Sequence, residues 1–109
     1  MTVCAYIVEK EYYYDSKTKK MWICKNIIDE LFNVTRNPNV FNIIAIWGDD
    51  CTNDDCCGEM TLDREQWDKI KDEYNIDKKL NKVINDNKEI FIKIEEYLYW
   101  NEVLELDCL

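Results

Sequence analysis

The chain has 109 residues and a mass of 13.2 kDa, with a formal net charge of −9, 47% hydrophobic residues and 13% aromatic residues. This length fits one domain, residues 1–109, and the apolar content excludes a disordered chain. The excess of negative charge disfavours direct binding to nucleic acid or to anionic membranes, since both present phosphates.

The N-terminal residues lack the basic and apolar regions of a signal peptide, and no apolar run approaches 18 residues. We therefore expect a soluble cytoplasmic protein whose six cysteines are thiols. Twelve lysines against two arginines, with many Ile and Asn residues, indicate an AT-rich genome such as that of a low-GC bacterium or its phage. In the viral case the compartment is the host cytoplasm.

The N-terminal third predicts a β-hairpin. Residues 3–14 favour a strand because β-forming residues fill both faces, a polar turn follows at 15–19, and residues 21–24 resume as a second strand. Residues 25–32 fit either an extension of that strand or a short helix, since Ile27, Ile28 and Leu31 have helical spacing. The stretch 33–39, which contains Pro38, predicts a loop.

Residues 40–47 are the most apolar run in the chain. Their length and β-branched content predict a buried central strand that ends at Gly48, followed by an acidic, cysteine-containing loop over residues 49–60.

Two helices have clear start signals. Asp63 fits the N-cap of the first, Gln66 completes a capping box, and Leu62 with Trp67 forms a hydrophobic staple. Asp77 caps a second helix. Residues 89–100 predict a third helix, although Ile90, Ile92 and Ile94 also alternate as in a strand, and residues 103–106 predict a closing strand. The fold class is a small single α+β domain, an antiparallel sheet of three to four strands packed by two to three helices.

The net charge is concentrated in residues 49–77. This segment contains eleven acidic and three basic side chains, and so carries −8 of the −9. On the helix that follows Asp63, a rotation of about 100° per residue directs Glu65, Asp68 and Asp72 away from Trp67. An ordinary solvated face is one interpretation of this row, and a contact surface for a partner is the other.

A metal site at the loop 49–60 is disfavoured. Cys51, Cys56 and Cys57 are the candidate ligands, but zinc needs a fourth ligand and the chain has no histidine. With Gly58 at position 6 of an EF-hand loop, Cys57 and Arg64 fall at ligand positions, which defeats a calcium match. We expect no metal and no cofactor.

Catalysis is also not expected. Without histidine the commonest general base is absent, and two glycines cannot build a phosphate-binding loop. The carboxylates around the loop cysteines raise thiol pKa values and so disfavour a thiolate nucleophile.

The sequence thus predicts a non-enzymatic protein that binds another protein. An acidic surface resembling nucleic acid phosphates would meet a basic surface of a nucleic-acid-binding protein or nuclease, with exposed aromatic residues supplying affinity. The expected contact residues are Asp49, Asp50, Asp54, Asp55, Glu59, Glu65, Asp68, Asp72, Tyr13 and Trp100. An inhibitor such as a phage anti-defence (anti-CRISPR-like) protein fits this description. A toxin-neutralising immunity protein and a Cys/Asp metal-binding or redox-responsive protein are the alternatives.

Overall fold

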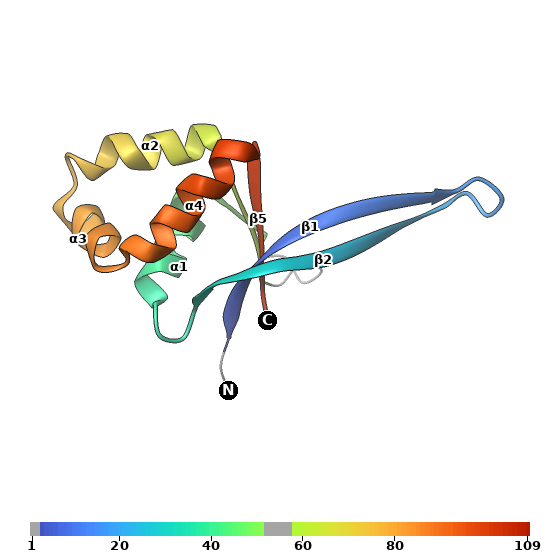
Figure 1. Ribbon diagram of the computed structural model, residues 1–109, viewed down its shortest axis with the longest axis horizontal. Helices are drawn as coiled ribbons and strands as arrows, with labels where there is room; N and C mark the ends of the chain where they lie inside the picture. The colour runs from blue at the N-terminus through green and yellow to red at the C-terminus, as the bar shows by residue number, and fades with distance from the viewer. Residues whose placement is uncertain (1–2, 52–57) are drawn as a thin grey trace.

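Helices cover one side of a β-sheet, and a long hairpin projects from the edge of that sheet (Figure 1). The structure, a computed structural model, describes residues 3–51 and 58–109. Its elements in chain order are β1 (Cys4–Asp15), β2 (Lys20–Asn33), α1 (Pro38–Trp47), β3 (Asp49–Cys51), β4 (Glu59–Asp63), α2 (Arg64–Tyr74), α3 (Lys78–Asp86), α4 (Lys88–Trp100) and β5 (Val103–Cys108).

The described strands form one antiparallel sheet in the order β2-β1-β5-β4-β3. Side chains along β4 and β5 point alternately to the two faces of the sheet. The face toward the helices buries Met60, Leu62, Leu104 and Leu106. These side chains pack against apolar stripes of the helices, and the core of the domain lies between the two layers. The α+β class is therefore confirmed, with five strands and four helices in the described residues.

The hairpin β1–β2 is much longer than the rest of the sheet. The two strands pair from Cys4↔Asn33 out to Asp15↔Lys20, whereas β1 pairs with β5 only over the stretch from Ala5 to Ile7. The outer residues, 9–28, extend away from the helices and are called the arm below (Figure 1). The arm gives the molecule dimensions of 55 × 32 × 23 Å and a radius of gyration of 15.3 Å, compared with about 13 Å for an ordinary domain of this length.

The predicted central strand at residues 40–47 is wrong, because this segment is the helix α1. Pro38 begins the helix at a position where no backbone N–H is needed. Val40, Ile43 and Ile44 then lie on one helical face and are buried. In this segment the helical spacing of the apolar residues is therefore a better predictor of the structure than their β-branched composition.

The residues after the first strand also differ in part from prediction. Residues 25–32 continue β2, which contains register irregularities opposite Ala5/Tyr6 and Ile7/Val8, and so the strand alternative is the observed one. The segment 49–60, predicted as a loop, supplies the strand β3 and the start of β4. The helices after Asp63 and Asp77, the helix at residues 89–100 and the closing strand are all confirmed.

Candidate interaction surfaces

The helix α2 is fixed at its start by the predicted capping box. The Asp63 carboxylate accepts a hydrogen bond from the backbone N–H of Gln66 at 2.7 Å, and the Gln66 side chain accepts one from the backbone N–H of Asp63 at 2.9 Å. Trp67 and Ile70 are buried in the core. Because these contacts set the rotation of the helix, they also determine which side chains point outward.

The outward face of α2 carries the predicted row of carboxylates. Glu65, Asp68 and Asp72 are exposed, with 82% of the Glu65 side chain and 68% of the Asp68 side chain accessible. Lys69 lies 3.8 Å from Glu65, and Lys71 lies 3.4 Å from Asp68. Such exposed pairs contribute little to stability, so the fold does not depend on this row.

Two basic side chains of the charged segment are directed toward α4. The guanidinium of Arg64 donates to the backbone carbonyls of Leu98 at 2.6 Å and Tyr99 at 3.1 Å, near the C-terminus of α4, where positive charge is favoured. Lys71 lies 3.4 Å from Glu95 of α4 as well as close to Asp68.

Exposed aromatic side chains lie beside this row. A hollow between α2 and α4 is lined by Asp68, Lys71, Glu95 and Tyr99, among others. Tyr99 meets Trp100 edge to face, with ring centroids 4.9 Å apart, and the two residues are 72% and 80% exposed. Carboxylates and large accessible rings therefore occur on one surface.

Asp49 lies beside the start of α2, where its carboxylate accepts a hydrogen bond from the Gln66 side chain at 3.3 Å, and it lines the hollow on the sheet that also contains Glu59. We define the acidic face by Glu65, Asp68 and Asp72. Asp50 and Cys51 are described only as backbone in β3. The predicted contact residues Asp54 and Asp55 and the candidate metal ligands Cys56 and Cys57 lie outside the described residues.

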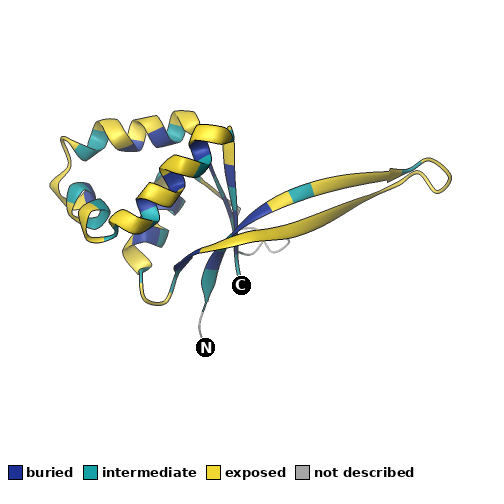
Figure 2. Cartoon of the chain, viewed as in Figure 1, coloured by how far each residue is buried: buried dark blue, intermediate teal, exposed yellow. Residues whose placement is uncertain are grey.

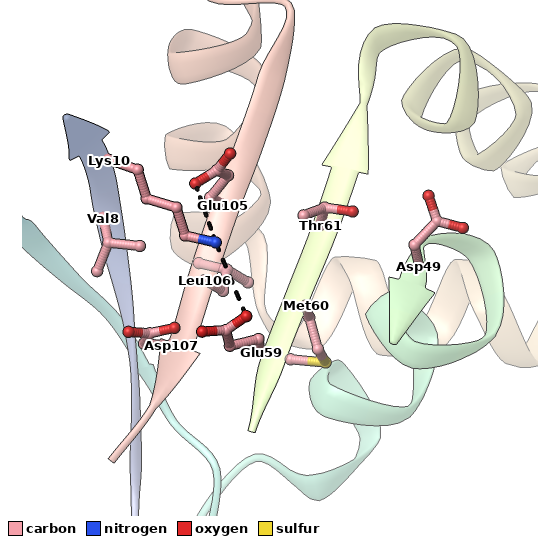
Figure 3. Close-up of a pocket in the computed structure, with 9 residues that line it drawn as sticks. All are labelled: Val8, Lys10, Asp49, Glu59, Met60, Thr61, Glu105, Leu106 and Asp107. Atoms are coloured by element: carbon pink, nitrogen blue, oxygen red, sulfur yellow. Dashed lines mark ion pairs between the residues drawn. The ribbon is translucent and has the colours of Figure 1, made fainter. Parts of the chain in front are cut away.

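Glu59 lies apart from the acidic face, in a cluster of charges on the sheet (Figure 3). Lys10 is 3.7 Å from Glu59 and 3.8 Å from Glu105, while Lys25 donates a hydrogen bond to Glu59 and lies 3.4 Å from Asp107. The hydrogen bond from Lys25 lowers the pKa of Glu59, and the same bond raises the pKa of Lys25. Glu59 therefore joins β4 to the hairpin.

This cluster lines a small hollow on the sheet (Figure 3). Within the part of the chain that the structure describes, Glu105 Oε2 and Asp107 Oδ1 are buried and accept no hydrogen bond. No group of three or more His, Cys, Asp or Glu residues among these residues could hold a metal ion. The two lysines instead compensate the charge of the carboxylates.

The arm places Tyr13 far from the acidic face (Figure 1). Both surfaces of the arm are accessible to solvent (Figure 2). Cross-strand pairs Tyr12↔Ile23 and Tyr14↔Met21 share one face, and Tyr13↔Trp22 lies on the other. The sequence contains more aromatic residues than the core can bury, so exposed aromatic residues can be predicted. The projection of the hairpin cannot be predicted, because it arises from the short pairing of β1 with β5, which covers only residues Ala5 to Ile7.

Comparison of the chain with protein-family models, with curated proteins and with solved structures finds no match. None of the helices in residues 3–51 and 58–109 has both the length and the apolar character needed to span a membrane.

Proposed function

We propose that this protein binds another protein through the acidic face and the adjoining Tyr99–Trp100 pair, and that its target is a basic surface used to hold nucleic acid. The protein then acts as a non-catalytic inhibitor, with a phage anti-defence role as the proposed setting. The proposal rests on one observation, the presence of the exposed Asp68 carboxylate and the exposed Tyr99 ring at the same hollow between α2 and α4.

The charge of the acidic face supports a role in binding a partner rather than in folding. Asp72 lies in the last turn of α2, where the helix dipole disfavours negative charge, and Asp68 lies near the middle of the helix. Their contribution to folding is therefore small, whereas their field accelerates encounter with a basic partner. Affinity comes from desolvated aromatic anchors, for which Tyr99 and Trp100 are the accessible side chains here.

The test is a quantitative capture experiment from host lysate with three tagged forms of the chain. The wild-type chain is compared with Asp68→Lys/Asp72→Lys and with a charge-matched control, Asp86→Lys/Glu89→Lys, whose residues are exposed on α3 and α4. We expect a basic nucleic-acid-binding protein to be retained by the wild type and the control and lost about tenfold or more in the Asp68/Asp72 variant.

The composition of the captured fraction decides between outcomes. A captured secreted nuclease would assign the protein as an immunity protein rather than an anti-defence protein. Partners that bind the Asp68/Asp72 variant as well as the wild type would contradict the role of the acidic face.

A further inference from the structure

The arm leaves a long apolar sheet edge uncovered. β2 is the edge strand of the sheet, and no other strand in the described part of the chain lies on its outer side. Five large apolar side chains of this strand are half exposed or more, namely Met21 at 63%, Trp22 at 53%, Ile23 at 54%, Ile27 at 58% and Ile28 at 50%. A long exposed edge of β-forming apolar residues is a template for pairing with another chain.

The arm also lacks the support that a hairpin needs. A two-stranded hairpin is marginally stable in water, and a third strand stabilises it. The chain exposes 7715 Å², whereas a folded monomer of its mass exposes about 6,400 Å². The surplus of about 1,300 Å² is larger than the roughly 800 Å² that each partner buries in a standard interface.

The charge of the hairpin favours a second copy of this chain as the occupant. Residues 4–33 contain five acidic and five basic side chains, so the hairpin is neutral and the remainder of the chain carries the full −9. Two acidic bodies repel each other, which disfavours a dimer packed through the helices. Two neutral arms can meet while the bodies remain far apart.

The sequence of β2 is complementary to itself in the antiparallel direction. Lys19 and Lys20 lie where the strand begins, and Asp29 and Glu30 lie toward its end. Antiparallel pairing of two copies brings the lysines of each copy next to the acidic residues of the other. Cys24 is the midpoint of the segment 21–27, so a two-fold axis at this residue aligns that segment with its own copy and places Met21 opposite Ile27.

Space is available where the tip of the second arm would arrive. A hollow between β2 and α4 is lined by Ile28, Asp29, Lys93, Glu96 and Trp100, together with neighbouring residues. Glu96 is exposed, and Asp29 lies 3.5 Å from Lys93. These carboxylates can accept the lysines of an incoming hairpin tip.

We infer that the protein forms a two-fold symmetric dimer in which the β2 edges of two copies pair antiparallel around Cys24. The two sheets become one continuous sheet with an acidic body at each end. This inference does not rest on the proposed function, because α2 lies away from the arm (Figure 1).

The test measures the mass of the full chain in solution by sedimentation equilibrium, from about 1 µM to about 100 µM, a range that spans a micromolar dissociation constant. The wild type should approach twice 13.2 kDa. Met21→Lys/Ile23→Lys should remain at 13.2 kDa, because lysines on an edge strand oppose pairing. The control Ile46→Lys/Ile76→Lys has the same charge change at apolar residues that are each 76% exposed, and it should dimerise as the wild type does.

A second measurement tests the register. In the dimer, diamide should remove two protons and two electrons from the two facing Cys24 thiols and link them as a disulfide. The cross-linked dimer should be lost in Cys24→Ser and kept in Cys4→Ser.

Several results would overturn the inference. A wild-type chain that stays monomeric over the whole concentration range would show that the β2 edge does not pair with a second copy. Dimerisation that persists in folded Met21→Lys/Ile23→Lys would place the interface elsewhere. A dimer without the Cys24 cross-link, or an assembly larger than a dimer, would contradict the two-fold pairing.

Discussion

At the scale of single residues, the charged cluster on the sheet explains how two lysines can face each other across the hairpin. Lys10 and Lys25 are directly paired in the β1–β2 register, an arrangement that costs free energy when it is not compensated. Glu59 interacts with both lysines, and Glu105 and Asp107 each interact with one. The cluster therefore links the base of the arm to β4 and β5.

This network predicts a pH-dependent contribution of Glu59 to stability. Because the pKa of Glu59 is lowered in the folded chain, its contribution is present above the usual glutamate pKa and is lost as the pH falls through the lowered value. Glu59→Gln should lower the free energy of unfolding by about 1 kcal/mol at neutral pH. In urea titrations this difference from the wild type should shrink as the pH falls below the usual glutamate pKa and through the lowered pKa of Glu59.

The control for this prediction is Glu65→Gln, whose side chain is 82% exposed and which should change stability little at either pH. A Glu59→Gln difference that stays constant between neutral and acidic pH would show that the ionised carboxylate does not stabilise the cluster.

At the scale of elements, the segments that could be predicted from the sequence are those that local chemistry determines. The start of α2 follows from Asp63 and Gln66 alone, because a capping box needs only residues within one turn. The strand predicted at residues 40–47 is wrong because β-branched composition is a weaker signal there than Pro38 and the i, i+3, i+4 spacing of Val40, Ile43 and Ile44, which indicate a helix. The strand β4 could not be predicted, since its partner residues in β5, from Val103 to Asp107, lie at least forty positions further along the chain.

The capping box gives a direct prediction for α2. Asp63→Ala should lower the free energy of unfolding by about 1 kcal/mol, because the partly buried start of the helix loses its hydrogen-bond acceptor. Asp63→Asn keeps an acceptor and should retain most of that stability. Thermal and urea unfolding of the two variants measure the difference, and equal losses for both would contradict a capping role.

Among the candidate contact residues, too, some positions can be predicted from neighbouring residues and others depend on contacts between distant parts of the chain. The outward direction of Glu65, Asp68 and Asp72 followed from helical geometry and from Trp67. Glu59 contacts Lys10 and Lys25 because β4 pairs with β5 and β1 pairs with β2. No local sequence pattern specifies these pairings. The proximity of Tyr99 to Asp68 likewise depends on the packing of α4 beside α2.

At the scale of the whole molecule, charge and apolar surface are separated in space. The hairpin is neutral, exposes large side chains and projects from the body, while the body carries the net charge of −9 and the acidic face on α2. We assign a different partner to each surface, a second copy to the edge of β2 and a basic protein to α2. The two surfaces meet at Trp100, which contacts Tyr99 and also lines the hollow between β2 and α4. Met21→Lys/Ile23→Lys and Asp68→Lys/Asp72→Lys leave this residue unchanged, so each should leave the other surface intact.

We propose that the acidic face occupies a surface of its partner that otherwise holds nucleic acid. The most direct measurement is a competition experiment in which the labelled chain, bound to its captured partner, is titrated with the nucleic acid of that partner. We predict mutually exclusive binding, with displacement of the chain and an association rate that falls steeply from low to physiological salt. A stable ternary complex of chain, partner and nucleic acid, formed at a salt-independent rate, would contradict this mode of binding.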